Sequence, residues 1–97
     1  MDKRIILDGQ EMTSKKRLHD YLTVQLNLPD YYGRNLDALK DCLTTDFTSQ
    51  TIEIIDAEAI EEHLGRYGNS LMRVFQDAAR ENEFLDIHIK NNREQFR

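Results

Sequence analysis

Two pairs of acidic residues have a spacing that could support chemistry. Asp37 and Asp41 lie four positions apart, and Asp77 and Glu81 repeat that spacing further along the chain. Because an α-helix advances about 100° per residue, the two members of such a pair project from one helix face. Like charges at this spacing destabilise a helix by about 0.2–0.5 kcal/mol, so helix stability alone does not favour them. Paired carboxylates act as acid and base in hydrolases, and they also bind cationic partners.

A catalytic or metal-binding role for these carboxylates has little support in the sequence. No feature predicts a cleft that would hold a substrate beside them, and an acidic helix face is also typical of ordinary solvated surface. An Asp-x-x-x-Asp spacing alone lacks the further ligands of a calcium loop or a zinc site. His19, His63 and His88 are isolated in the sequence, and we expect each to be a surface or structurally satisfied residue. We predict no enzyme activity, no metal ion and no cofactor.

The single cysteine, Cys42, adds no chemistry of its own. One cysteine excludes an internal disulfide, so the fold must depend on packing. Cys42 falls on the same helix face as Leu39 and Leu43, which predicts a buried and inert thiol. Nothing nearby in the sequence supplies the base or the positive charge that a reactive thiolate needs.

The composition is that of a globular protein with an acidic surface. The 97 residues are 39% hydrophobic and 32% charged, which favours one domain over residues 1–97, with residues 91–97 as a polar tail that frays. A net charge of −5 argues against direct nucleic-acid binding and favours basic protein partners. No apolar run approaches the roughly 20 residues of a membrane span, and the N-terminus does not resemble a signal peptide. We expect a cytoplasmic protein, not bound to membranes and monomeric when free.

The elements that must position the first acidic pair are predicted as a strand and two helices. Residues 3–7 are apolar and β-branched and end at a turn, which predicts a buried strand. Thr13 or Ser14 can cap a helix that runs to about residue 25 or 26. Pro29 and Gly33 then mark a turn, in which the glycine permits the backbone dihedral φ to become positive.

The second predicted helix carries the first acidic pair on its polar face. Asn35 can cap its first turn, and the helix is expected to end near residue 44 or 45. Its leucines and Cys42 gather on one side at helical spacing. The polar residues gather opposite them: Asp37, Asp41 and Thr44, with Lys40 at the edge of this face.

Two further helices are predicted in the second half of the chain. Asp56 can cap a short helix over residues 57–64, which Gly65 closes. Residues 68–70 are expected to begin a longer helix that carries the second acidic pair. Arg73 lies one turn before Asp77 on this helix and is expected to neutralise it partly.

Strand patterns at residues 51–55 and 85–89 complete the predicted order, β-α-α-β-α-α-β. Strands separated by helical crossovers favour parallel pairing. The sequence therefore predicts an α/β fold in which helices pack on a small three-stranded parallel sheet. In such a fold the two acidic helix faces could meet in one anionic patch, with Tyr31 at its edge.

The segment LPDYYGRNLDALKDCLT, residues 28–44, resembles the characteristic motif of the barstar family, whose founding member is an intracellular inhibitor of the ribonuclease barnase. A weaker resemblance continues over roughly the whole chain. It implies a barstar-like fold with a three-stranded parallel sheet. It also implies an inhibitor that blocks the cationic active site of a barnase-like ribonuclease or ribonuclease toxin with an acidic helix face. The alternative is a binding module of the same fold for another basic protein, in toxin immunity or regulation.

The resemblance also implies which residues contact the partner. It gives Asp41 the central role, in the ribonuclease active site, and pairs Asp37 with a basic residue nearby. Tyr31, Asp77 and Glu81 match other binding positions of the family. The complete predicted partner-binding set is Tyr31, Asn35, Asp37, Lys40, Asp41, Thr44, Asp46, Asp77 and Glu81.

Three residues depart from the family pattern. Lys40 and Asp46 stand where the family has tryptophans, and Thr45 stands where it has a glycine. Aromatic residues often dominate binding energy, so these changes should weaken binding to barnase or favour a ribonuclease whose active-site rim differs from that of barnase. Lys40 is expected to pair with Asp37 at i−3, and a partner with an acidic residue facing Lys40 would suit this chain.

Overall fold

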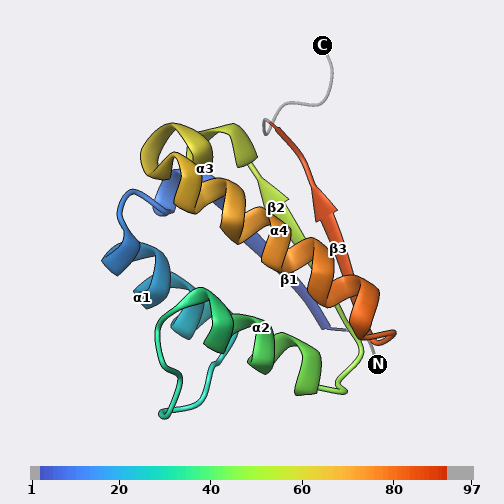
Figure 1. Ribbon diagram of the computed structural model, residues 1–97. Coiled ribbons are helices and arrows are strands. Elements are labelled where there is room, and N and C mark those ends of the chain that lie inside the picture. Colours follow the sequence, from blue (N-terminus) through green and yellow to red (C-terminus); the bar gives the residue numbers. More distant parts are fainter. Residues whose placement is uncertain (1–2, 92–97) are drawn as a thin grey trace.

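Three parallel strands form one sheet in the computed structural model, which describes residues 3–91 (Figure 1). The strands are β1 (Lys3–Asp8), β2 (Gln50–Ile55) and β3 (Leu85–Ile89), in the spatial order β1-β2-β3. Ile5 of β1 pairs with Ile52 of β2, which pairs with Ile87 of β3. A short 3-10 helix, η1 (Gly9–Glu11), follows β1, and the α-helices are α1 (Lys15–Gln25), α2 (Leu36–Thr45), α3 (Ala57–Leu64) and α4 (Arg66–Glu81).

The element order confirms the predicted α/β fold, with four α-helices and a parallel sheet among the described residues. Most of the tail predicted at residues 91–97 lies outside the described residues. Between residues 3 and 91, no helix is long and apolar enough to cross a membrane.

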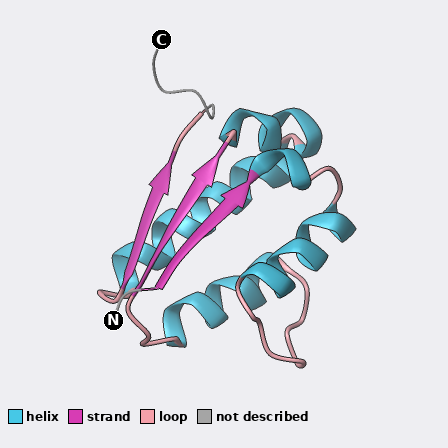
Figure 2. Ribbon diagram, turned by 180° about the vertical axis from the view of Figure 1, so that it is seen from behind, coloured by secondary structure: helices cyan, strands magenta, loops and turns pink. Residues whose placement is uncertain are grey.

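Only one face of the sheet is covered by helices. From behind, the strands lie in front of α4 and no helix covers them (Figure 2). Leu7, Ile52 and Ile54 on the covered face are fully buried, whereas Ile6 on the open face is 53% exposed. The prediction of a wholly buried first strand was therefore wrong for half of its side chains. Strands of parallel sheets are usually buried on both faces and are then continuously apolar. The short apolar run at the start of this chain was therefore expected to be buried on both faces.

The caps predicted for α1 and α2 are confirmed. The Ser14 hydroxyl accepts a hydrogen bond from the Arg17 amide at 3.2 Å, and the Asn35 side-chain oxygen accepts one from the Ala38 amide at 2.8 Å. Each cap satisfies one of the amides that the first turn leaves without a helical partner. The start and direction of α2, and so of its acidic face, are fixed by Asn35.

The junction between α3 and α4 differs from the prediction at two residues. Asp56 adopts a left-handed conformation with φ 51° and makes no side-chain cap hydrogen bond, although it directly precedes α3. The helix α4 begins at Arg66, so Gly68 lies in its first turn rather than before it. A Cβ atom on Gly68 would come within 2.7 Å of the Ile60 carbonyl oxygen. This glycine therefore permits close packing of α3 and α4, and Gly65, with φ 56°, makes the turn between them.

Candidate partner-binding surface

Asp37 and Asp41 project from the outer face of α2. Both residues are exposed, and neither forms an ion pair with a cation in the described part of the chain. The buried side of the helix carries Leu39 and Leu43, as the periodicity predicted. Asp37 also lies in the first turn of α2, where the helix dipole stabilises a negative charge. The two carboxylates thus stand on a rigid helix with their charge uncompensated.

Lys40 connects α2 to α4 instead of pairing with Asp37. Its amine lies 2.9 Å from the Glu81 carboxylate. The hydrogen bond that Lys40 donates to Glu81 is the main cause that raises the pKa of Lys40, and the nearby Asp77 adds to the effect. The predicted i−3 pairing was wrong because α4 brings a second carboxylate to the edge of α2, which the sequence of α2 alone does not reveal.

The second acidic pair is more strongly compensated than the first. Asp77 is half-buried and forms an ion pair with Arg80, not with Arg73 as predicted, while Glu81 is held by Lys40. We refer to Asp37, Asp41, Asp77 and Glu81 together as the acidic surface. Its free negative charge is concentrated on α2, and its α4 half is largely neutralised.

Tyr31 lies on the flank of α2 that faces away from α4. Its side chain is 86% exposed, and it borders an open groove of about 290 Å³ that Cys42, Thr45 and Asp46 also line. At about 100° per residue, Thr45, Asp41, Asp37 and Lys40 follow one another in that order around α2. Asp41 and Asp37 therefore both lie between the tyrosine groove and the bridge to α4, with Asp41 nearer the groove.

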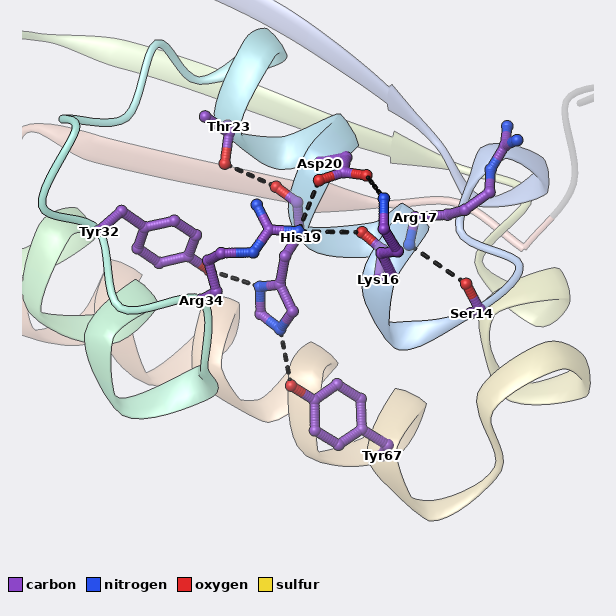
Figure 3. Close-up of polar contacts among 9 residues, drawn as sticks. All are labelled: Ser14, Lys16, Arg17, His19, Asp20, Thr23, Tyr32, Arg34 and Tyr67. Carbon is purple, nitrogen blue, oxygen red and sulfur yellow. Dashed lines mark hydrogen bonds and ion pairs between the residues drawn. The ribbon is translucent and has the colours of Figure 1, made fainter.

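The loop that carries Tyr31 is held from beneath by a buried histidine (Figure 3). His19 is 3% exposed, and its Nδ1 lies 2.7 Å from the Tyr32 hydroxyl while its Nε2 lies 2.8 Å from the Tyr67 hydroxyl. Burial lowers the pKa of His19, and Arg34 lowers it further. A neutral imidazole donates through one nitrogen and accepts through the other, so both tyrosines are satisfied. His19 thereby links α1, the loop and α4, which confirms a structurally satisfied residue.

Arg34 fixes the other end of the same loop. It has a positive φ of 58°, and its guanidinium lies 2.5 Å from the Asp20 carboxylate (Figure 3). The sequence assigned the change of backbone sign to Gly33, which does not have positive φ. A Cβ atom on Gly33 would lie 3.3 Å from the Asn35 side-chain nitrogen and 3.4 Å from the Ala38 Cβ. A side chain at position 33 would therefore meet the Asn35 cap closely, while the left-handed backbone conformation belongs to Arg34.

Three residues of the predicted partner-binding set already serve the fold. The side-chain oxygen of Asn35 is used by its cap, and the Thr44 hydroxyl donates to the Lys40 carbonyl at 2.9 Å. The Asp46 carboxylate accepts from the Thr48 amide at 2.9 Å. These groups shape the surface, whereas Tyr31, Asp37 and Asp41 are the side chains most free to meet a partner.

The described residues provide no catalytic or metal-binding arrangement. No group of three or more potential metal ligands occurs between residues 3 and 91. Cys42 is half-buried rather than fully buried, and burial together with the charge of Asp41 raises the pKa of its thiol. A thiol held in its protonated form is a poor nucleophile. His63 and His88 are exposed, as predicted.

Sequence reasoning missed three residues beside the C-terminal end of α2: Asn82, Phe47 and Phe84. Asn82, which follows α4, is 3% exposed, and its amide nitrogen donates to the carbonyl oxygens of Leu43 and Asp46. Phe47 and Phe84 are exposed beside it. A single asparagine after a helix looks like an ordinary turn residue, and only the placement of α2 against α4 shows that it joins two segments 36 or more positions apart.

The fold and the surface together define a small α/β protein that presents acidic side chains from two adjacent helices. The chain belongs to the barstar family: the family model "Barstar (barnase inhibitor)" matches residues 3–97. It is also 42% identical over 81 residues to the Bacillus subtilis (strain 168) protein named "Putative ribonuclease inhibitor YrdF", a match that covers 81% of this chain and 88% of the relative.

These comparisons confirm the resemblance seen in residues 28–44. Proteins of this family are inhibitors and not enzymes, which agrees with the prediction of no enzyme activity. Family membership and the relative support a ribonuclease-inhibitor-like role for this chain.

Proposed function

We propose that this protein inhibits a barnase-like ribonuclease or ribonuclease toxin by placing the acidic face of α2 in its cationic active site. The observation that carries the proposal is the pair of exposed carboxylates, Asp37 and Asp41, without a cationic partner in the described residues. The resemblance to the barstar family gives Asp41 the central contact, and its position beside the Tyr31 groove supports a role for both side chains.

Carboxylates on a rigid helix can substitute for the phosphates that a ribonuclease binds. A ribonuclease cleft must be cationic to hold RNA, and an inhibitor of net charge −5 is attracted to it before contact. The helix and its loop are already ordered by Asn35, His19 and Arg34, so little conformational freedom is lost on binding. The proposed setting is the cytoplasm, with the inhibitor monomeric before it meets the enzyme.

A second candidate is a binding module of the same fold for another basic protein, such as a divergent toxin or a regulator. The observation that favours it is the Lys40–Glu81 bridge between α2 and α4, in a chain that has no tryptophan. Lys40 adds a cation here, and α2 has no large aromatic side chain to contact a partner. Both differences would change which partner surface, around its binding cleft, fits beside the acidic surface.

Inhibition of RNA cleavage tests the proposal. Barnase would be assayed on RNA with increasing amounts of this protein, and cleavage should stop as the two reach equal concentrations. An Asp86→Ala variant, changed on the open face of β3, should inhibit as well as the wild type. If cleavage continues at a large excess of wild type, the barnase-like target is wrong. Capture of a basic protein lacking ribonuclease activity, lost on Asp41→Ala, would then support the second candidate.

A further inference from the structure

Two exposed phenylalanines contact each other beside the C-terminal ends of α2 and α4. Phe47 is 69% exposed and Phe84 is 41% exposed, and their rings meet edge to face with centroids 6.0 Å apart. Isolated apolar side chains on a surface need no explanation, but two aromatic rings in contact form a continuous apolar patch. We call Phe47 and Phe84 the aromatic pair.

The backbone on both sides of the aromatic pair is held by one buried side chain. The Asn82 amide nitrogen donates to the Asp46 carbonyl at 2.8 Å and to the Leu43 carbonyl at 2.9 Å. Its side-chain oxygen accepts from the Phe84 amide at 3.0 Å. The segment before Phe47 and the amide of Phe84 are therefore joined to the same residue. A backbone held in this way loses little freedom when a partner covers the two rings.

The aromatic pair continues the acidic surface rather than forming a separate region. Asn82 directly follows Glu81, which bridges to Lys40, and Phe47 directly follows Asp46 at the end of α2. Figure 1 shows the chain leaving α2 beside the turn between α4 and β3, where Asn82 joins them. A partner that covers the end of α2 would reach both rings.

We propose that the aromatic pair is an apolar contact region for the same ribonuclease, which meets an apolar rim beside its cationic cleft. This inference rests on the proposed function. Charge complementarity brings the ribonuclease to Asp37 and Asp41 on α2, and the rings beyond the C-terminal end of that helix supply a water-excluding contact that adds binding energy. Carboxylates set the rate and direction of encounter, and the rings slow dissociation.

The experiment measures binding of barnase to variants of the full chain by surface plasmon resonance. Phe47→Ala is the main variant, because this ring is mostly exposed and follows the end of α2. Phe84→Ala and the double variant accompany it. Ile6→Ala is the matched control, since Ile6 is 53% exposed on the open face of the sheet. Circular dichroism confirms the fold of each variant, and Phe47→Ala alone decides the result if Phe84→Ala fails to fold.

We expect each phenylalanine variant to bind about tenfold more weakly, through faster dissociation and an unchanged association rate, with Ile6→Ala like the wild type. Wild-type affinity in the Phe47→Ala variant, with tight wild-type binding, would overturn this inference and leave the proposed function standing. No binding by the wild type would overturn both. If sedimentation shows a wild-type dimer that Phe47→Ala dissociates while barnase affinity is unchanged, the occupant is a second copy and the inference is wrong.

Discussion

The amine of Lys40 on α2 lies 2.9 Å from the carboxylate of Glu81 on α4. This bridge joins the two helices that carry the acidic surface, and it neutralises one of the carboxylates that would attract a cationic partner. Together with the Asp77–Arg80 pair, it leaves Asp37 and Asp41 as the acidic groups with uncompensated charge. We therefore expect the recognition of a basic partner to be concentrated on α2.

Removing the bridge should speed association with a cationic ribonuclease. Lys40→Ala frees the Glu81 charge, so the acidic surface becomes more negative and long-range attraction to barnase increases. We expect a higher association rate at low salt that approaches the wild-type rate at high salt, where the charges are screened. Stopped-flow mixing at several salt concentrations measures this.

The control for this prediction is Arg66→Ala, which changes the net charge equally at the exposed start of α4, at the opposite end of that helix from Glu81. It should raise the association rate less than Lys40→Ala does. Equal rates for Lys40→Ala and the wild type at every salt concentration would show that this part of the surface does not face the ribonuclease.

The buried His19 should make folding stability depend on pH below about 7. Burial lowers its pKa in the folded state, and in the unfolded state the pKa is about 6.5. Between these two values the unfolded chain binds more protons, so the free energy of unfolding decreases as pH falls through about 6.5. The decrease ends below the folded-state pKa. Urea unfolding at a series of pH values measures it.

His19→Gln should remove this part of the pH dependence, whereas His63→Gln, at an exposed position of α3, should retain it. The charged groups that act on His19 are Arg34, which lowers its pKa, and Asp20, which raises it. A pH dependence of equal slope in the wild type and His19→Gln would show that other groups titrate in this range.

Part of this architecture is visible in the sequence and part depends on contacts between distant segments. Ser14 and Asn35 could be recognised as caps because a cap bonds only to amides of its own first turn. The strand and helix order was likewise a matter of local periodicity. The partner of Lys40 could not be recognised, because Glu81 is 41 positions away and only the packing of α4 brings it close.

The roles of glycines show the same division. Gly65 was predicted to end α3, and its positive φ of 56° agrees with a local turn. Gly68 was predicted to start a helix. Its lack of a side chain instead allows α4 to pack closely against Ile60 of α3, which the local sequence pattern does not indicate. A side chain at position 33 would similarly meet the Asn35 cap closely, while Arg34 adopts the left-handed conformation and is held by Asp20 on α1. The aromatic pair was missed because its two rings belong to different loops.

Leu39 should contribute strongly to stability from beneath the acidic face. Its side chain is fully buried in the core below α2. Leu39→Ala should lower the free energy of unfolding by about 2–5 kcal/mol through lost burial and the cavity left behind. Chemical denaturation measures the change. Val24→Ala, at a position 74% exposed on α1, should change stability by less than about 0.5 kcal/mol. Equal costs for the two variants would contradict the packing described.

Asn82 should be needed for the fold as well as for the aromatic pair. Asn82→Ala leaves two buried or partly buried carbonyls and the Phe84 amide without their side-chain partner, so the free energy of unfolding should fall by at least about 2 kcal/mol. Asn82→Asp keeps the shape but places a carboxylate against two carbonyl oxygens, and it should cost at least as much. Asn69→Ala, at an exposed position of α4, is the matched control. Thermal unfolding that is the same for all three variants would exclude this role.

The most direct test of the proposed inhibitor is titration calorimetry of barnase with the wild type, Asp41→Ala and Asp86→Ala. Asp41 is exposed on the polar face of α2, whereas Asp86 is exposed on the open face of β3. We expect tight one-to-one binding by the wild type and Asp86→Ala, and affinity lower by about thirtyfold or more for Asp41→Ala with its fold intact. Equal affinity of the wild type and Asp41→Ala would contradict the claim that α2 enters the ribonuclease active site through this carboxylate.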